Sequence, residues 1–419
     1  MVLAVIDGEP VTEGDIKYAL TISHRREDLS SAGKLDLSGY VKRMVDDRLI
    51  INEARNAGMD KYPEVQQAVQ AYILRESVVR LHDEEIVKKV DVTEEEIKEH
   101  YKKIYASTEE FDRVKRRIER KIRKQKEKDR SDEYLKYLRE KYHVKIDREL
   151  LEAIDPNGVE EERRKWANDK TVVASVNGSV LTAIDFISMF KPSQANVKED
   201  VVNAWIERKL VDHEAVNRHY ENDPDFKKMI GRYENQLLKN TFIKRVIIPQ
   251  ISITEEALNE YYLNNQKDFM KPRLYRIQQI TVKTMDEAME ILNSVRDGAD
   301  FSWLAKRYSS DSASSRGGDV GWVTKKELPL QFREGIDDLK IADISPVIDL
   351  ESSYRIIKLT GRTEDEVEEF DKVKDAVSRA LFNEKLDSLL EKYVNELKKE
   401  AEIKIYNEEI KSLEEKLQG

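Results

Sequence analysis

The chain has 419 residues, enough for about three domains of roughly 150 residues each. Charged residues make up 37% of the chain, against about 25% in an average globular domain, so small cores and long solvated helices are expected. The net charge of −10 argues against nucleic-acid binding through the surface as a whole. The absence of cysteine excludes disulfides, zinc-thiolate sites and a catalytic thiol, and no segment approaches the roughly 20 apolar residues of a membrane span.

The chain opens on a short β-prone run, Val2 to Ile6, which ends in Asp7-Gly8. Asp-Gly after such a run is a strong signal for a tight hairpin. Thr12 follows at a position suited to capping a helix whose first turn contains Asp15. The same pattern returns over residues 174–185, where Asn-Gly takes the place of Asp-Gly. We therefore expect two similar hairpins, each followed by a capped helix.

Amphipathic helices are predicted after each hairpin. Pro63 and Pro224 punctuate them, and each proline is placed to start a further helix. Thr93 and Thr254 precede glutamate-rich segments and indicate two more capped helix starts. The apolar residues that recur at helical spacing are Val41, Met44, Val45 and Leu49 in the first half, and Val201, Trp205 and Leu210 in the second.

The two halves match each other with a jump in register. Arg48-Leu49-Ile50 returns as Lys209-Leu210-Val211, an offset of 161, whereas Glu109-Glu110-Phe111 returns as Glu368-Glu369-Phe370, an offset of 259. The difference of 98 residues is present only in the second copy. The chain therefore reads as a duplicated module, with a segment the size of a small domain inserted into the second copy.

Each copy is predicted to close with a long charged helix, over residues 109–142 and 366–400. Both helices run into a β-type tetrad, Val144 to Asp147 or Ile403 to Tyr406. A lone strand of this length is not stable in water, so we expect each tetrad to pair with an opening run such as Val2 to Ile6. The sequence leaves open whether this pairing is within a copy, between copies or between chains.

The inserted segment, residues 273–362, departs from the helical pattern of its surroundings. It predicts a small α+β domain with mixed strands in the order β-α-α-α-β-β. The predicted strands are 276–282, 344–347 and 354–359, and the predicted helices are 285–296, 301–309 and 328–338, with a turn-rich stretch over 310–321.

This segment resembles a parvulin-type peptidyl-prolyl isomerase domain over its full length. The residues that carry the likeness are Asp300-Phe301, Leu304-Ala305, Tyr308-Ser309, Asp311, Gly317-Gly318-Asp319-Val320-Gly321-Trp322, Phe332, Ile344-Ser345-Pro346-Val347 and Tyr354-Arg355-Ile356-Ile357-Lys358-Leu359. The flanking copies resemble the helical chaperone module of the SurA and PrsA families, in which a parvulin unit is inserted. The resemblance implies binding of unfolded chains and rotation about X-Pro bonds, which needs no covalent chemistry.

The resemblance implies a site made of two parts. An apolar pocket for the proline ring falls at Val320, Leu328 and Phe332, and Asp311 takes the position of the acidic or thiol group near the twisting carbonyl. Without the resemblance, the three apolar residues are as well explained by core packing, and Asp311 by capping of a turn. These alternatives stay open.

The chain departs from the family at its two facing histidines, which fall at Gln279 and Arg355. No histidine lies between residues 273 and 362. Glutamine both donates and accepts hydrogen bonds, so Gln279 can replace part of the histidine network, whereas Arg355 only donates. Arg355 is placed to pair with Asp311 or to offer a donor to a substrate carbonyl. We therefore expect catalysis, assigned to Asp311, Gln279 and Arg355, to be weak or absent, with an active isomerase as the alternative.

A basic run over residues 113–130 holds eleven Lys or Arg against three Asp or Glu, a net charge of +8. Such a run is typical of a nucleic-acid or anionic-membrane contact, of a solvated helix face, or of a stripe that attracts acidic unfolded segments. No aromatic residue interleaves the run, and the corresponding helix in the second copy is not basic. We expect no nucleic-acid partner.

The fold class predicted is α+β, with mostly helical duplicated modules, short terminal strands and an inserted parvulin-type domain. The domains expected are a first module at 1–155, a linker at 156–170, a second module at 171–272 with 363–419, and the parvulin-like domain at 273–362. The function expected is that of an exported chaperone, periplasmic or at the cell surface, whose partners are unfolded polypeptides. A non-catalytic interaction scaffold is the second alternative.

The remaining expectations concern ligands, location and assembly. No metal or cofactor is implied, since the six histidines lack a ligand-like spacing with supporting carboxylates. The chain starts directly on a predicted strand, so we expect an export signal to have been removed. The clients, the residues that hold them, and homodimer formation are left open by the sequence.

Overall fold

The structure is a computed structural model that describes residues 1–24, 36–105, 111–154, 165–166, 168–189 and 198–418. The chain divides into two compact units, one made of residues 1–246 and 393–419 and the other of residues 247–392. The linker predicted at 156–170 lies largely outside the described residues. The domain boundaries predicted from the sequence repeat stay a prediction. The two compact units divide the chain by how its residues pack, which does not test where each copy of the repeat begins and ends.

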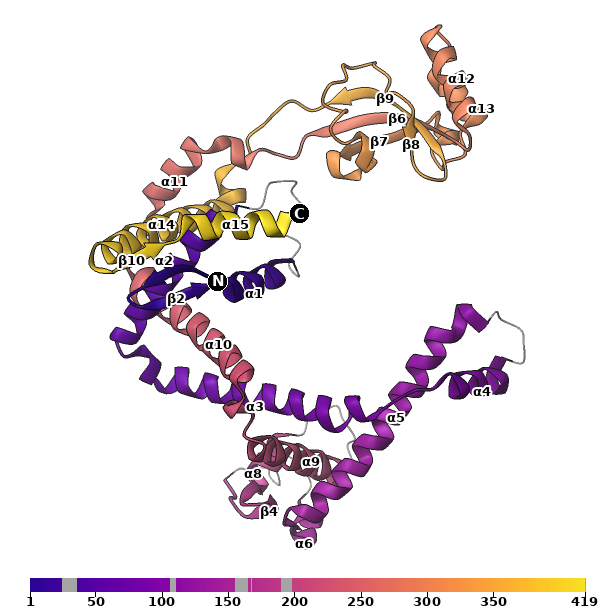
Figure 1. The fold of residues 1–419 in the computed structure, drawn as a ribbon. Helices are drawn as coiled ribbons and strands as arrows, with labels where there is room; N and C mark the ends of the chain where they lie inside the picture. Colours follow the sequence, from indigo (N-terminus) through magenta and orange to yellow (C-terminus); the bar gives the residue numbers. More distant parts are fainter. Residues whose placement is uncertain (25–35, 106–110, 155–164, 167, 190–197, 419) are drawn as a thin grey trace. The chain divides into compact units, whose positions relative to one another are not determined.

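The first unit is mostly helical and contains two small sheets (Figure 1). None of the helices in the described ranges is long and apolar enough to span a bilayer. Its elements are β1 (Val2–Ile6), β2 (Glu9–Thr12), α1 (Glu13–His24), α2 (Leu37–Asn56), α3 (Pro63–Glu85), α4 (Glu94–Tyr105), α5 (Phe111–Lys141), β3 (Val144–Ile146), α6 (Arg148–Ala153), β4 (Val172–Val176), β5 (Ser179–Thr182), α8 (Ala183–Ser188), α9 (Lys198–Asn217), α10 (Pro224–Phe242), β10 (Ile403–Ile405) and α15 (Asn407–Gln418).

The two predicted hairpins are present and share one turn geometry. Asp7 and Gly8 have φ angles of 49° and 84°, and Asn177 and Gly178 have φ angles of 44° and 89°. Two consecutive positive φ angles are what a two-residue type I′ hairpin requires, which explains Asp-Gly and Asn-Gly at these points. Both hairpins also carry a register shift at the same place, between Val2 and Ala4 in one and between Val172 and Ala174 in the other.

The closing strands pair with the opening strand of the other half of the chain. Strand β3 pairs with β4, with Ile146 opposite Ala174, and β10 pairs with β1, with Ile405 opposite Ala4. The result is two three-stranded sheets, β10-β1-β2 and β3-β4-β5. The pairing that the sequence left open is therefore made within one chain, between the two halves.

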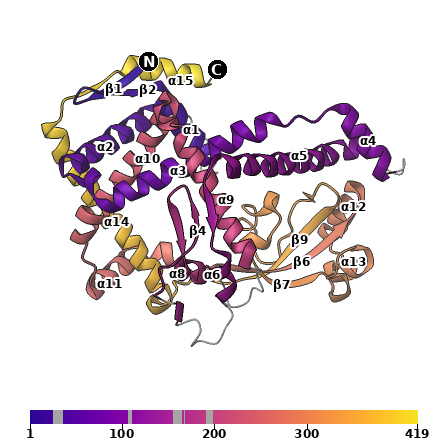
Figure 2. The same cartoon turned by 90° about the horizontal axis from the view of Figure 1, so that it is seen from below.

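The long helices are exchanged in the same way (Figure 2). Helix α10 packs on α2, while α3 packs on α9, and α3 and α10 also contact each other. At that contact Tyr72 stacks on Tyr233 with ring centroids 3.9 Å apart and an interplanar angle of 4°. The two tyrosines are counterparts in the repeat, related by the same offset as Arg48 and Lys209. A residue that meets its own counterpart is the mark of a two-fold related interface.

A buried ion network joins α3, α5 and α9. Glu214, 2% exposed, accepts hydrogen bonds from Lys141 Nζ at 2.6 Å, Tyr142 Oη at 2.8 Å and Arg218 Nε at 2.8 Å. Arg218 also donates to Glu85 at 2.8 Å. Burial alone would raise the pKa of Glu214, but the hydrogen bonds from Lys141, Arg218 and Tyr142 outweigh it and hold the pKa below its usual value.

The second unit holds a four-stranded sheet in the order β7-β6-β9-β8. Helices α12 and α13 pack on one face through an apolar cluster that includes Ile280, Phe301 and Ile356. Its elements are α11 (Glu255–Asn264), β6 (Leu274–Val282), α12 (Met285–Arg296), α13 (Phe301–Tyr308), β7 (Asp319–Thr324), β8 (Ile348–Asp349) and β9 (Tyr354–Arg362), and α14 (Phe370–Glu400) continues into the first unit.

Three details of this unit differ from the sequence prediction. All pairings in the sheet are antiparallel, so a mixed sheet is wrong, and β7, which was not predicted, pairs with the first half of β6. The helix expected over 328–338 is a single 3₁₀ turn at Leu330–Phe332 followed by turns. Pro329 holds Leu328 in an extended conformation, and Gly335 disfavours a helix in the rest of the segment.

The strand expected over 344–347 is also displaced. Only Ile344 forms a bridge, to Lys358, and the paired strand is β8. Pro346 has no N–H to donate to a ladder, which accounts for the break. Ser345 covers the gap, because its N–H donates to the carbonyl of Ile357 at 2.7 Å and its Oγ accepts from the N–H of Ile357 at 2.9 Å.

Candidate functional site

Strands β6 and β9 place three polar side chains on one face of the sheet in the second unit. Gln279 and Thr281 are two residues apart on β6, so they point to the same side. Arg355 on β9 is the direct partner of Thr281, and Ile357 is the partner of Gln279. The sequence-predicted residues Gln279 and Arg355 are therefore brought together, next to the apolar cluster that contains Ile357.

Asp311 completes this cluster from the turn after α13. Its Oδ2 accepts hydrogen bonds from Gln279 Nε2 at 3.2 Å and Ser309 Oγ at 3.0 Å. Its Oδ1 accepts from the N–H of Ala313 at 2.8 Å, which is the turn-capping contact considered from the sequence. Asp311 thus both caps the turn and faces Gln279, and the glutamine supplies the donor that the implied histidine network requires.

Arg355 is held close to Asp311 without a direct ion pair. Its Nε donates to Thr281 Oγ1 at 3.2 Å, and the described ion pairs within 4.0 Å do not include one between Arg355 and Asp311. Burial lowers the pKa of the Arg355 guanidinium below its usual value, and the negative charge of Asp311 opposes that change. The guanidinium therefore keeps donors that Asp311 does not use.

The glycine pair of the Gly-Gly-Asp motif fixes the approach of this loop to β6. Gly318 has a φ of 81°, and a Cβ placed there would lie 2.4 Å from the carbonyl oxygen of Gln279. In addition, the N–H of Gln279 donates to the carbonyl of Gly318 at 2.9 Å. Only glycine permits this contact, which holds the Gln279 backbone in register with the turn that carries Asp311.

The three residues predicted for the proline pocket pack in one apolar cluster. Leu328 is 3% exposed and Phe332 is 6% exposed, and both pack with Ile336 and Ile357, with Val320 at the edge of the cluster. All three lie on the sheet face that also carries Gln279 and Arg355. Their burial agrees with the core-packing explanation, and their role in binding proline stays a prediction.

Two residues of the cluster were not singled out from the sequence. Ser309 Oγ donates to Asp311 and accepts from the N–H of Thr281 at 2.9 Å, and Thr281 in turn accepts from Arg355. They link the two ends of the site. The signal available was the alternation of Thr281 with Gln279 along one strand, together with the position of Ser309 inside the parvulin-like motif.

A groove of about 580 Å³ lies among α3, α5 and α9 of the first unit. Val79, which lines the groove, is 58% exposed. The residues that line it are Ala71, Leu74, Arg75, Val78, Val79, Ser131, Leu135, Glu207, Arg208, Val211 and Asp212. Sequence reasoning did not find this groove, because it is formed by helices that are remote in the chain. Its volume is in the range that protein pockets use to bind ligands.

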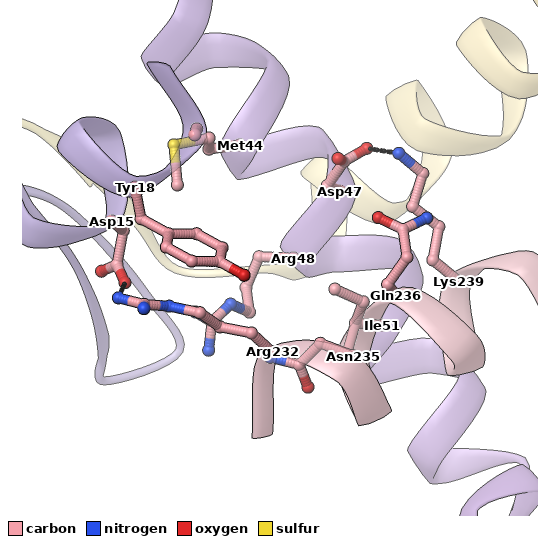
Figure 3. A pocket seen from close by; sticks show the side chains of 11 residues that line it. Asp15, Tyr18, Met44, Asp47, Arg48, Ile51, Arg232, Asn235, Gln236 and Lys239 are labelled. Carbon is pink, nitrogen blue, oxygen red and sulfur yellow. Dashed lines mark hydrogen bonds and ion pairs between the residues drawn. The ribbon is translucent and has the colours of Figure 1, made fainter. Parts of the chain in front are cut away.

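A second, smaller cavity of about 160 Å³ lies among α1, α2 and α10 (Figure 3). Its lining is mostly polar, and several of the lining side chains contact one another. Arg232 stands over the ring of Tyr18 at 4.0 Å and pairs with Asp15 at 3.5 Å, while Lys239 pairs with Asp47 at 2.6 Å. These interactions occupy charged side chains that line the cavity and leave few polar groups free for a ligand.

Comparisons with known proteins agree with this architecture. Residues 253–375 match the family of the PPIC-type PPIASE domain. The foldase protein PrsA of Caldanaerobacter subterraneus is 26% identical over 287 residues, which cover 59% of this chain and 91% of that protein. The periplasmic chaperone PpiD of Haemophilus ducreyi is 31% identical over 147 residues, which cover 35% of this chain and 24% of that protein.

Two solved structures are similar to parts of this chain. One of the SurA-like chaperones PEB4 and Cj1289 of Campylobacter jejuni matches at 24% identity with a TM-score of 0.33, covering 56% of this chain and all of that one. The PrsA structure from Bacillus anthracis matches at 24% identity with a TM-score of 0.23, covering 44% of this chain and 86% of that one. The chain is therefore similar to the PrsA foldases and to the chaperone PpiD, and its residues 253–375 match a parvulin-type (PpiC) domain.

Proposed function

We propose that this protein is an extracytoplasmic chaperone that binds unfolded or incompletely folded polypeptides. The observation that carries the proposal is the open groove among α3, α5 and α9, whose lining includes Leu74, Val78, Val79 and Val211. Exposed apolar surface of this kind is costly to keep unless it binds something apolar. Relatives named as foldases and as a periplasmic chaperone support the same reading.

The proposal is tested by comparing how tightly this protein binds the unfolded and the folded form of one model protein. Reduced, carboxymethylated α-lactalbumin stays unfolded in buffer, whereas the native protein with its disulfides intact is compact. We expect fluorescence anisotropy to detect binding of the labelled unfolded form and not of the native form. Equal binding of both forms, or of neither, would support the scaffold alternative.

We further infer that the parvulin-type domain is a weak isomerase. Rotation about an X-Pro bond crosses a barrier of about 20 kcal/mol, and polar groups that favour the twisted amide lower it. Asp311, Gln279 and Arg355 supply such groups, but Gln279 and Arg355 stand where the family has its two histidines. Arg355 only donates hydrogen bonds, so it replaces the histidine network in part.

NMR exchange spectroscopy on an X-Pro peptide tests this inference. We expect a cis–trans exchange rate well below that of a histidine-bearing parvulin on the same peptide, and a further loss in Asp311→Ala. A rate equal to that of the histidine-bearing enzyme would favour the alternative of a fully active isomerase. Binding shifts without any acceleration would mean that the domain only recognises proline.

The proposed location outside the cytoplasm is supported by similarity to relatives, among them a periplasmic chaperone. Fractionation of the source cells, followed by immunodetection, tests it. We expect the protein in the fraction outside the inner membrane, and recovery with cytosolic enzymes alone would refute this part of the proposal.

A further inference from the structure

The apolar groove and the polar cavity are built from corresponding positions of the two halves. Four residues of α3 that line the groove have repeat counterparts on α10 that line the cavity. These pairs are Ala71 and Arg232, Leu74 and Asn235, Arg75 and Gln236, and Val78 and Lys239. Equivalent positions of the repeat therefore line a largely apolar groove on α3 and a polar cavity on α10.

The counterparts on α10 are used up in contacts within the protein. Asn235 accepts a hydrogen bond from Arg55 at 2.6 Å, and Lys239 pairs with Asp47. In the α3 groove the same positions are apolar, and Val79 is left 58% exposed. Three of the four α3 positions are apolar, at Ala71, Leu74 and Val78, and the fourth, Arg75, pairs with Glu76. The apolar part of the groove is therefore free for an external apolar group.

The groove continues into a basic face along α5. Ser131 and Leu135 line the groove, and Lys128, Lys124 and Lys121 precede them at spacings of three and four residues, so all five share one side of the helix. Within the described part of the chain, Lys121, Lys124 and Lys128 have no carboxylate within 4.0 Å. The groove therefore opens onto a row of positive charges that the protein does not neutralise itself.

This basic face is long, and the exposed charged side chains of α5 from Arg113 to Lys128 are all basic; the exposed Asp129 and Asp132 follow it, toward the groove. It extends over fifteen helical steps, or about 22 Å at 1.5 Å per residue. The charged side chains that α5 exposes between residues 113 and 128 are Arg113, Arg116, Arg117, Arg120, Lys121, Lys124 and Lys128. Such a field attracts anionic segments, although the chain as a whole carries a charge of −10.

We propose that the groove and the basic face of α5 form one binding site for an unfolded polypeptide segment in which an apolar stretch lies next to acidic residues. The proposal rests on the proposed chaperone function and specifies the chemistry of its clients. The apolar stretch occupies the space around Leu74, Val78 and Val79, and the acidic residues lie along Lys121, Lys124 and Lys128. A nucleic acid has negative charge but no apolar stretch for the groove.

Peptide binding by the full chain tests the proposal. The probe is a fluorescein-labelled peptide in which leucine and valine are followed by glutamate, and its partner has lysine in place of glutamate. Val79→Asp places a charge in the groove, and the triple variant Lys121→Glu, Lys124→Glu, Lys128→Glu reverses the basic face. Asn240→Asp, at the repeat counterpart of Val79, is the matched control.

We expect the glutamate peptide to bind more tightly than the lysine peptide, and more weakly as salt is added. Val79→Asp and the triple variant should each weaken binding about tenfold, while Asn240→Asp leaves it unchanged. An equal loss of peptide affinity in Asn240→Asp, or no loss of affinity in Val79→Asp, would refute the assignment of the groove as the binding site. If a single-stranded oligonucleotide binds more tightly than the glutamate peptide, and this binding depends on the three lysines but not on Val79, the site is a nucleic-acid site instead.

The same variants separate this inference from the proposed function. If Val79→Asp still binds unfolded α-lactalbumin as the wild type does, the groove is not the client site, and the chaperone proposal stands. If the wild type binds neither the peptide nor unfolded α-lactalbumin, both proposals fall.

Discussion

The ion network around Glu214 makes the helical unit sensitive to a single change. In Glu214→Gln the carboxylate is lost, and Lys141 and Arg218 are left beside a neutral group. Removing one partner of a buried ion pair costs about 3–5 kcal/mol. The side chains of Lys141 and Arg218 are 38% and 33% exposed, so water screens part of this cost. We expect a loss of about 2 kcal/mol in the free energy of unfolding.

Urea unfolding followed by tryptophan fluorescence measures this loss. Trp166 is 9% exposed and packs in the core beside the network, while Trp303 and Trp322 are more than half exposed. The fluorescence change on unfolding therefore reports mainly on the first unit. With a slope of about 2 kcal/mol per molar urea, the midpoint should fall by about 1 M.

Glu53→Gln is the matched control, because Glu53 is the repeat counterpart of Glu214. Glu53 is only half-buried and accepts one long hydrogen bond, 3.5 Å from Tyr393 Oη. We expect its replacement to change the unfolding free energy by less than about 0.5 kcal/mol. Equal losses in the two variants, or no loss in Glu214→Gln, would refute the argument.

The pH dependence of the unfolding free energy, compared between wild type and Glu214→Gln, provides a second check on the same network. Because the pKa of Glu214 is lower in the folded state than in the unfolded state, its contribution is fully present above the unfolded value of about 4.3. The contribution is lost as the pH falls through the folded pKa. The difference between wild type and Glu214→Gln should therefore shrink below pH ~4. A difference that stays constant down to pH ~3 would contradict the assignment.

Three further outcomes follow from the structure. Gly318→Ala should destabilise the second unit by more than about 2 kcal/mol, because a Cβ there meets the carbonyl of Gln279 at a positive φ; an unchanged melting temperature would contradict this. Tyr72→Ala should cost about 2 kcal/mol through loss of the stack on Tyr233, measured by urea unfolding, and a loss below about 0.5 kcal/mol would mean that the α3–α10 contact is incidental. Lys115→Ala should leave the urea midpoint of unfolding unchanged, because its ion pair with Glu94 lies at the solvent-exposed surface, and a clear fall in the midpoint would contradict this.

Local signals in the sequence predicted the elements well. Asp7-Gly8 and Asn177-Gly178 predicted two hairpins, and Pro63 and Pro224 start α3 and α10 as expected. These features depend on backbone preferences of one or two residues, which neighbouring sequence determines. The helix expected over 328–338 was wrong, because Pro329 and Gly335 both disfavour a helix in that segment.

Features that depend on long-range pairing could not be predicted in the same way. Nothing in the strands beginning at Val144 and Ile403 distinguishes one partner hairpin from the other, since the two hairpins are alike. The family resemblance singled out Gln279, Arg355 and Asp311 but suggested Arg355 as the partner of Asp311, whereas the structure pairs Asp311 with Gln279. The role of Thr281 between Arg355 and Ser309 depends on strand register. Register is fixed by the packed sheet as a whole.

Suppression of aggregation is the measurement that tests the central claim most directly. A chemically denatured model enzyme is diluted into buffer with the full chain, and light scattering is followed for the wild type and Asp311→Ala. The account predicts suppression by both proteins at or below equimolar amounts, because binding of unfolded chains is assigned to the helical unit and not to Asp311. No suppression by either protein at several-fold excess would contradict it.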